Sequence, residues 1–395
     1  MPGPGAYWFG REETEAVLEV INSGYLFRYG SENDPKFLHK VSDLEKEFAA
    51  YCHADYALAT SSGTAALIAS VLALGLKPGD EIIVPAYTFV ASYSSVIFPG
   101  IVPVLAEIDN SLTLDPEDIE HRITPRTKAI MPVHMLGNVC DMDRIMAVAK
   151  RHNLFVLEDC CQAAGASYKG KKVGTIGNIS SFSLNIFKTI NSGDGGLVVT
   201  NDKALYETAF AVHDQGHKPL RFGVEVGSRN ILGLNFRMNE LTAAVGLVQL
   251  KKIGLIVDTL REKRNKFRNL ISGVKGFEFR RLNDPLADCA TLCTVIFDTK
   301  EQAAKVTTAL GSKTIDQSGW HVYSNMEHVL NHLKKVGQPC TKGSYPITDD
   351  ILSRSMNISI GVVDAGLGAG WGININSTDA EIESAAGQFV AACNS

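Results

Sequence analysis

The sequence predicts an α/β protein whose central sheet is mostly parallel and covered by helices. Over most of the first 250 residues, short apolar runs alternate with segments of helical spacing. The apolar runs are continuous, which is typical of strands that are buried on both faces of a sheet. Strands that alternate with helices in this way form largely parallel sheets. After about residue 250 the pattern changes, which indicates a second and smaller α/β domain.

The elements of the large domain follow from this alternation. Strands are expected at residues 56–59, 81–84, 102–107, 128–133, 155–158, 181–183 and 197–200. Helices are expected at residues 11–22, 42–51, 88–98 and 141–152, together with one that ends near residue 74. Ser42 and Glu45 have the spacing of a capping box, which predicts that the second of these helices begins at Ser42.

The C-terminal part opens with a long charged helix at residues 250–270. Strands are expected next at 277–281 and 293–297, a helix at 301–310, and a last helix at 379–392 that Ser377 or Thr378 introduces. We therefore place an N-terminal extension at residues 1–14, a large cofactor-binding domain at 15–250 and a small C-terminal domain at 251–395.

Composition excludes several classes of partner. The chain has 38 basic and 43 acidic residues, so it offers no broad positive surface for nucleic acid or anionic lipid. Its eight cysteines form no Cys-x-x-Cys pair, which favours reduced thiols in the cytoplasm and no metal site. No secretory signal is apparent, and the apolar stretch at 56–76 is interrupted by Thr-Ser-Ser-Gly-Thr, so no membrane span is expected.

Candidate functional residues follow the strands, because ligands of parallel sheets bind at the carboxyl ends of strands. Ser62, Gly63 and Thr64 open a helix after the first strand. Their N–H groups and hydroxyls can hold a phosphate, and an ordinary helix cap is the alternative.

Two further strand ends carry groups suited to pyridoxal phosphate. Asp159 ends the run Leu-Phe-Val-Leu-Glu-Asp, with Gln162 one turn later, and its carboxylate can pair with a protonated pyridine nitrogen. The alternative for Asp159 is a helix cap. Lys188 follows Ser183 and precedes a Gly-Asp-Gly-Gly turn, so the amine is held from both sides, as a Schiff-base lysine requires. A solvated lysine beside a turn is the alternative, but together these residues describe one pocket.

Other motifs give weaker indications. Residues 165–172 have the spacing of a P-loop, but Lys172 stands where Ser or Thr must bind magnesium. No dinucleotide fingerprint is present in the glycine-rich stretches 193–196 and 366–372. His134 follows another strand, where it either approaches the cofactor or packs structurally. A sugar could stack in the small domain on an aromatic and polar group, for which surface or core packing is the favoured alternative: Trp320, His321, Tyr323 and His328.

Five ordered motifs carry a family resemblance, at residues 62–67, 79–92, 158–163, 181–196 and 233–238. They resemble the DegT and StrS type of pyridoxal-5′-phosphate (PLP) sugar aminotransferases, which have the fold-type-I architecture. The resemblance implies a Schiff-base and proton-shuttle role for Lys188, and a pyridine-nitrogen contact for Asp159. It further implies that the cofactor is bound by Ser62, Gly63, Thr64, Phe89, Gln162, Ser183 and, across the interface of a homodimer with shared active sites, Asn235.

The resemblance also implies the reaction. We expect a cytoplasmic transaminase of amino-sugar biosynthesis that moves an amino group to a keto or aldehyde sugar. The expected donor of this group is L-glutamate. The acceptor stays open between a nucleotide-linked sugar and an octulosonate, since residues 24–29 and 351–354 resemble the amino-octulosonate subgroup. A PLP-dependent deoxysugar dehydratase is an alternative, but family members of that kind carry histidine at the position of Lys188. A PLP-binding regulator is a second alternative.

Overall fold

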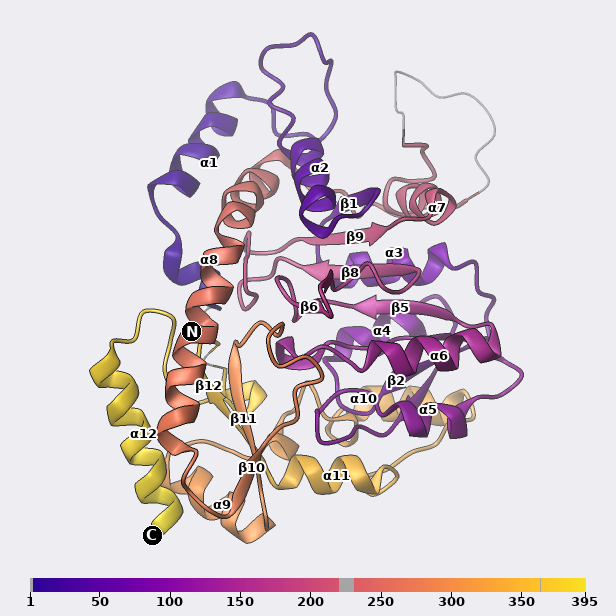
Figure 1. Cartoon of the computed structure of the whole chain (residues 1–395). Helices are drawn as coiled ribbons and strands as arrows, with labels where there is room; N and C mark the ends of the chain where they lie inside the picture. The colour runs from indigo at the N-terminus through magenta and orange to yellow at the C-terminus, as the bar shows by residue number, and fades with distance from the viewer. Residues whose placement is uncertain (1–2, 220–230, 363) are drawn as a thin grey trace.

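The protein is described by a computed structural model over residues 3–219, 231–362 and 364–395, and it is built on two sheets (Figure 1). Among these residues the larger sheet has seven strands in the order β1-β9-β8-β5-β4-β2-β3, and the smaller has the order β10-β11-β12. The strands of the larger sheet are β1 (Tyr56–Thr60), β2 (Glu81–Pro85), β3 (Val102–Ala106), β4 (Thr127–Ile130), β5 (Phe155–Asp159), β8 (Ile179–Ser183) and β9 (Gly196–Thr200). Those of the smaller sheet are β10 (Phe277–Phe279), β11 (Leu292–Phe297) and β12 (Ser355–Ser359), and a separate hairpin joins β6 (Ser167–Tyr168) to β7 (Lys171–Lys172).

The helices alternate with the strands as expected. In the first part of the chain they are α1 (Arg11–Ser23), α2 (Lys40–Cys52), α3 (Gly63–Ala73), α4 (Val90–Ile97), α5 (Pro116–Arg122), α6 (Met142–His152) and α7 (Lys203–His213). They continue with α8 (Glu240–Ile271), α9 (Lys300–Ala309), α10 (Glu327–Lys335), α11 (Pro346–Ser353) and α12 (Asp379–Asn394). All seven predicted strands of the large domain are confirmed, within two residues at the start and a few at the end.

The larger sheet is buried on both faces. Neighbouring strands from β8 to β3 run parallel, and β9 runs antiparallel to both of its neighbours, β1 and β8. Ile83 points into a core with α2, α6 and α8, whereas Ile82 and Val84 point into a second core with α3, α4 and α7. The mostly parallel α/β architecture predicted from the continuous apolar runs is thereby confirmed.

Helix α8 links the two parts of the chain. It begins at Glu240, ten residues before the predicted start of the long helix at 250, and contacts α1, α2, α12 and β11. The predicted domain boundary between residues 250 and 251 therefore falls inside a continuous helix. The division into a large and a small domain stays a prediction.

The predicted start of α2 at Ser42 is wrong. The helix begins at Lys40, because the carboxylate of Glu240 accepts hydrogen bonds from the N–H groups of Lys40 (2.8 Å) and Val41 (3.0 Å). The Ser42 hydroxyl instead donates to the His39 carbonyl at 3.0 Å. A carboxylate two hundred residues away in the sequence thus caps this helix in place of the local serine.

Helix α12 begins at Asp379 as predicted, and of the two candidates Ser377 and Thr378 it is Thr378 that caps it, in a capping box with Glu381. Thr378→Ala is expected to lower the free energy of unfolding by about 1 kcal/mol, because it removes the hydroxyl that accepts from the Glu381 N–H. Urea denaturation measures this loss. Thr378→Ser keeps the acceptor and is the matched control, so equal stability of both variants would contradict the cap.

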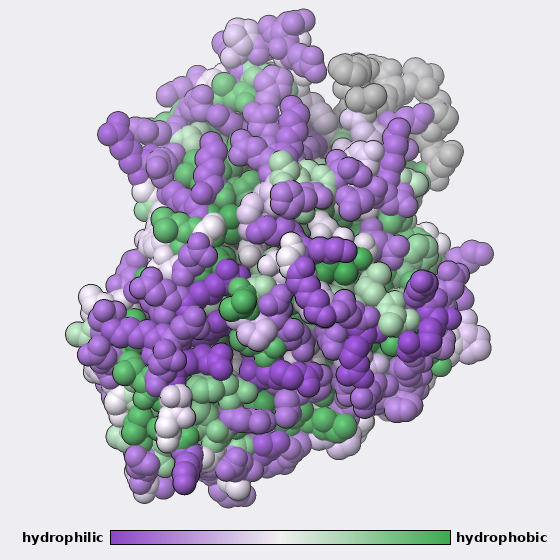
Figure 2. All heavy atoms as spheres, in the orientation of Figure 1, coloured by the Kyte–Doolittle hydropathy of each residue, from purple (hydrophilic) through white to green (hydrophobic). Residues whose placement is uncertain are grey.

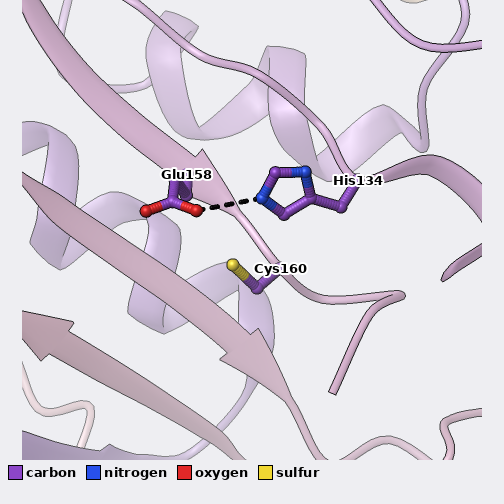
Figure 3. Close-up of side chains that lie close together, drawn as sticks. All are labelled: His134, Glu158 and Cys160. Carbon is purple, nitrogen blue, oxygen red and sulfur yellow. Dashed lines mark hydrogen bonds and ion pairs between the residues drawn. The ribbon is translucent and has the colours of Figure 1, made fainter. Parts of the chain in front are cut away.

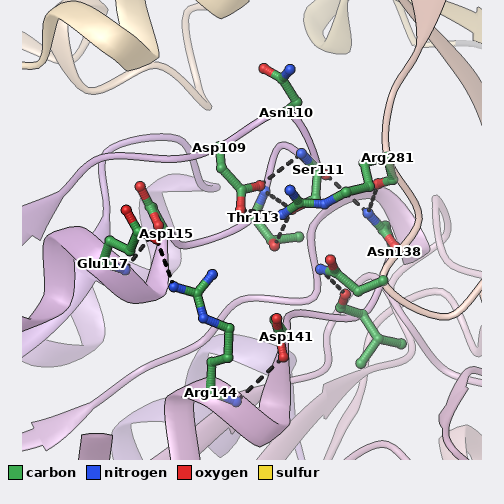
Figure 4. A network of polar contacts seen from close by, with 12 residues as sticks. Asp109, Asn110, Ser111, Thr113, Asp115, Glu117, Asn138, Asp141, Arg144 and Arg281 are labelled. Carbon is green, nitrogen blue, oxygen red and sulfur yellow. Dashed lines mark hydrogen bonds and ion pairs between the residues drawn. The ribbon is translucent and has the colours of Figure 1, made fainter.

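A polar network connects the segment that follows β10 to the loop that follows β3 (Figure 4). Arg281 forms an ion pair with Asp109. The amide of Asn138 donates to the carbonyl oxygens of Ser111 and Arg281, both at 3.0 Å. These bonds fix the turn at residues 135–138 against both parts of the chain, and that turn borders the cavity described below.

The visible surface is mainly hydrophilic. In Figure 2 purple side chains prevail on this face, and green ones lie between them in small groups. Among the described residues, no helix is both long enough and apolar enough to cross a membrane.

Candidate active site

A cavity of about 680 Å³ lies at the carboxyl ends of the parallel strands. It lies between the end of the larger sheet, the loop after β8 and the segments around residues 320 and 365. Eight of the nine predicted site residues line it: Ser62, Gly63, Thr64, Phe89, Asp159, Gln162, Ser183 and Lys188. The single pocket predicted from separate strand ends is therefore present in the structure.

The first turn of α3 forms one end of this cavity. Ser62 is the N-cap residue, and its hydroxyl accepts from the Ala65 N–H at 3.1 Å. A Cβ atom on Gly63 would lie 2.7 Å from Ser183 Cβ and 3.2 Å from Cys161 Sγ. Only glycine leaves this space open, at a helix N-terminus whose N–H groups favour an anion. The helix cap and the phosphate cradle are thus compatible interpretations of the same residues.

Gly63→Ala is expected to weaken cofactor binding by about 10-fold or more, because the methyl group displaces Ser183 from the helix N-terminus. The dissociation constant of PLP, followed by absorbance or fluorescence, measures the effect. Gly254→Ala is the matched control, since a Cβ there meets nothing within 4 Å. Unchanged PLP affinity in Gly63→Ala would exclude the cradle.

Asp159 presents a fixed, buried carboxylate at the end of β5. The Ser92 hydroxyl donates to Oδ2 at 2.7 Å, and the Cys161 N–H donates to Oδ1 at 3.0 Å. The side chain is 4% exposed, so what remains of its hydrogen-bonding capacity faces the cavity that it lines. Such a group suits a cationic ring nitrogen, because both donors orient it and neither neutralises its charge.

Lys188 lies in the loop between β8 and β9, whose turn is closed by a bond from the Lys188 N–H to the Asn185 carbonyl at 2.9 Å. Burial lowers the pKa of its ammonium below the ordinary lysine value, although Cys161, Asp159 and Asp364 act in the opposite direction. A lowered pKa increases the neutral fraction of the amine, which is the nucleophilic form. The environment is that of a reactive lysine and differs from that of a solvated one.

Gln162 and Phe89 border the middle of the cavity. The Gln162 side-chain oxygen accepts from the Leu136 N–H at 2.9 Å, which orients the amide. Phe89 is 40% exposed, with its ring open to the cavity. Both side chains line the same cavity as Asp159.

Asn235 does not line the cavity. Its side chain is exposed, and its backbone forms a bridge with Asp214. An exposed position is what a contact to a second subunit requires, and the contact itself stays a prediction.

The four aromatic and polar residues predicted near residue 320 lie in different environments. Trp320 and His321 line the cavity, Trp320 as an exposed side chain and His321 as a buried one, and a contact of either with a sugar stays a prediction. The favoured expectation of surface or core packing is right for Tyr323, which is fully buried, and for His328, which is exposed on α10. Sequence reasoning missed Asn185, Asp194 and Asp364, whose loops reach the cavity through the fold alone.

His134 is a packed structural histidine that lies close to Glu158 and Cys160 (Figure 3). It does not line the cavity. Its Nδ1 accepts from the Cys140 N–H at 3.2 Å, so Nε2 carries the proton that it shares with Glu158 at 3.0 Å. Glu158 also accepts from three backbone N–H groups, at 2.7–2.9 Å. Among the described residues, His134, Glu158 and Cys160 form the one group whose side chains could together hold a metal ion. The ring nitrogens of His134 and the carboxylate oxygens of Glu158 are, however, already used in hydrogen bonds.

Comparison with known proteins identifies the class. The GDP-perosamine synthase of Escherichia coli O157:H7 is 39% identical over 267 residues, which are 67% of this chain and 69% of that protein. The GDP-perosamine synthase of Vibrio cholerae is 30% identical over 352 residues, 88% of this chain and 90% of that one. The structure of NtdA from Bacillus subtilis with bound cofactor PMP has a TM-score of 0.79 at 25% identity, and covers 99% of this chain and 84% of that one.

The fold is that of a PLP-dependent aminotransferase. Residues 9–363 match the DegT/DnrJ/EryC1/StrS aminotransferase family. The chain belongs to that family, which confirms the resemblance found in the five sequence motifs.

The residues present fit PLP. The space above Gly63 would be closed by a single Cβ, the helix N-terminus beside it suits a phosphate, and the carboxylate of Asp159 suits the pyridine nitrogen. Lys188 lies on the same cavity and has a pKa shifted in the direction that its chemistry requires.

Proposed function

We propose that this protein transfers an amino group from L-glutamate to the carbonyl group of a sugar, and that the sugar is nucleotide-linked. The observation that carries the proposal is one cavity that joins Lys188, Asp159 and the α3 N-terminus to a polar and aromatic wall at Trp320 and His321. The volume of about 680 Å³ is ample for a cofactor together with a substrate.

Each residue has a role that follows from its position. When bound, PLP supplies an electron sink for the carbon that loses its proton. Lys188 Nζ holds the cofactor and then moves a proton within the cavity, for which its lowered pKa suits it. Asp159 holds the pyridine nitrogen protonated, and Ser62, Thr64 and Ser183 bind the phosphate with the free N–H groups of α3. Phe89 and Gln162 orient the ring.

The nature of the acceptor is supported by similarity. Both relatives described above are GDP-perosamine synthases, and an enzyme that makes an amino sugar by amino transfer needs a keto sugar as acceptor. We therefore favour a nucleotide-linked keto sugar over an octulosonate. A deoxysugar dehydratase is disfavoured by Lys188 itself, since the family members of that kind carry histidine there.

The test is transfer of the label from ¹⁵N-glutamate to a panel of keto sugars, free, nucleotide-linked and octulosonate-type. A labelled amino sugar from a nucleotide-linked substrate supports the proposal. Loss of a hydroxyl group from the sugar without incorporation of ¹⁵N would identify a dehydratase instead. A protein that binds PLP but reacts neither with glutamate nor with any sugar would be a regulator.

We further propose a homodimer in which Asn235 completes the site of the second subunit. Asn235 is exposed and lies outside its own cavity, as such a role requires. Mixing the inactive variants Lys188→Ala and Asn235→Ala under conditions that exchange subunits is then expected to restore activity, because one site of each mixed dimer keeps both residues. No recovery in mixed dimers demonstrated by native mass spectrometry would place Asn235 within its own site.

The expected compartment is the cytoplasm. All eight cysteines, which lie at described positions, are free thiols, and unpaired thiols are typical of a reducing compartment. Fractionation of the source cells tests this expectation.

A further inference from the structure

His321 occupies a fixed place on the wall of the cavity. Its ring centroid lies 5.3 Å from that of Phe89, and the side chain is 5% exposed. Its backbone carbonyl accepts from the Thr88 N–H at 2.9 Å, and the neighbouring Trp320 carbonyl accepts from the Val90 N–H at 3.0 Å. These main-chain bonds hold the imidazole beside the ring that we expect to stack on the cofactor.

Ser318 determines which ring nitrogen carries the proton. Its hydroxyl oxygen lies 2.5 Å from the Gly366 carbonyl oxygen and 3.0 Å from His321 Nδ1. A carbonyl can only accept, so the single hydroxyl proton goes to Gly366. The hydroxyl must then accept from the ring, and Nδ1 is the protonated nitrogen.

The second ring nitrogen is an acceptor without a protein partner. Burial, with Lys188 nearby, lowers the pKa of His321 to about 3, so the ring is neutral and Nε2 carries no proton. Among the described residues no group donates a hydrogen bond to Nε2. The fully buried side-chain nitrogen and oxygen atoms without a partner do not include His321 Nε2. Since Nε2 has no protein donor, it must be accessible, and it is open to the cavity that His321 lines.

We propose that His321 Nε2 accepts a hydrogen bond from a hydroxyl group of the sugar acceptor, and that Ser318 is the positioning residue that keeps Nε2 free for it. The inference rests on the proposed function and deepens it, because it makes His321 a determinant of specificity for hydroxylated acceptors. A neutral imidazole of low pKa is a poor base at neutral pH, which sets this role apart from proton exchange with Lys188.

The experiment separates the two half-reactions of the holoenzyme. L-glutamate alone converts the cofactor to its aminated form, which is followed by the loss of visible absorbance. The aminated enzyme is then mixed with the keto sugar that wild type accepts in the ¹⁵N screen, and kcat and KM are measured. The variants are His321→Phe, which keeps the ring contact with Phe89, and His321→Gln, whose amide oxygen can reach the position of Nε2. Ser318→Ala and the exposed His328→Gln complete the set.

In His321→Phe the KM for the sugar is expected to rise about 10-fold or more, while the half-reaction with glutamate stays within twofold of wild type. His321→Gln is expected to restore most of the sugar affinity. The KM of Ser318→Ala should lie between those of the two His321 variants, because the imidazole of His321 is then free to turn. The KM of His328→Gln should match that of wild type. In wild type labelled with ¹⁵N-histidine, the Nε2 resonance of His321, assigned by its loss in His321→Gln, is expected to shift when the sugar binds.

Three results would overturn the inference. An unchanged KM for the sugar in His321→Phe, or an Nε2 resonance that ignores the sugar, removes the contact. An equal loss in both half-reactions assigns His321 to proton transfer with Lys188. A wild type that reacts with glutamate but with no sugar in the panel refutes the proposed function itself, which is a distinguishable outcome.

Discussion

Replacement of Lys188 by alanine is expected to lower the rate of amino transfer by about 10³-fold or more. The variant lacks the amine of Lys188, which lines the cavity and has a lowered pKa. We expect this amine both to attach the cofactor and to carry the proton. The visible absorbance of the bound cofactor is expected to change as well. Single-turnover measurement of the glutamate half-reaction, together with the absorption spectrum, checks both effects.

Lys172→Ala is the matched control for this experiment. Lys172 is also partly buried and also has a pKa lowered by burial, but it lies on the hairpin strand β7 with its ammonium 3.0 Å from the Tyr51 hydroxyl, outside the cavity. Its replacement should leave the half-reaction unchanged. If both variants, or neither, lose activity, the reactive lysine has been misassigned. Partial rescue of Lys188→Ala by added ethylamine would confirm that the missing group is the amine.

Replacement of Asp159 by asparagine is expected to lower kcat by about 10²–10³-fold, because it removes the only charge on the group that we expect to face the pyridine nitrogen. The amide keeps the size of the carboxylate and one acceptor for the Cys161 N–H or the Ser92 hydroxyl. The fold should therefore be retained. The measurement is the rate of exchange of the α-proton of glutamate with solvent, followed by NMR.

Ser92→Ala tests the same group more gently. It removes the donor 2.7 Å from Asp159 Oδ2 and keeps the charge, so a loss of about 10-fold is expected. If Asp159→Asn exchanges the α-proton as fast as wild type, the carboxylate has no electronic role. If Ser92→Ala lowers the rate of α-proton exchange more than Asp159→Asn does, only the hydrogen-bond geometry of the carboxylate matters.

The large sheet could be predicted from sequence because most of its strands are continuous apolar runs, and because both faces of the sheet are covered. The site could be predicted for a related reason. In a parallel sheet the residues that follow different strands meet at one edge, so Ser62, Asp159 and Lys188 were placed together without any knowledge of distances.

The small sheet was harder to predict, because its last strand β12 does not look like a strand. Ser355, Asn357 and Ser359 are polar, but they are fully buried. The Ser355 hydroxyl donates locally to the Ile351 carbonyl at 2.6 Å, whereas Asn357 accepts from the distant Thr294 hydroxyl and donates to the Leu367 carbonyl, both at 2.7 Å. The burial of Asn357 depends on tertiary contacts, which the local sequence pattern does not reveal.

The position of Trp320 and His321 on the cavity was only one of two alternatives in the sequence, for the same physical reason. Trp320 and His321 reach the cavity because a short segment of the C-terminal part lies against the end of β2, where Val322 forms a bridge with Tyr87. Nothing in the local sequence around residue 320 specifies that pairing. The capping of α2 by the distant Glu240 is a second case in which a remote group overrides the local signal.

The pairing of that segment with residues 87–90 uses main-chain groups, with the N–H groups of Thr88 and Val90 bound to the carbonyls of His321 and Trp320. Bonds of this kind do not depend on which side chains the two positions carry. Substitutions at positions 320 and 321 can therefore replace the surface offered to the acceptor while the cofactor side keeps its geometry. This arrangement lets a lineage of such enzymes diversify in the sugars it aminates without rebuilding its chemistry.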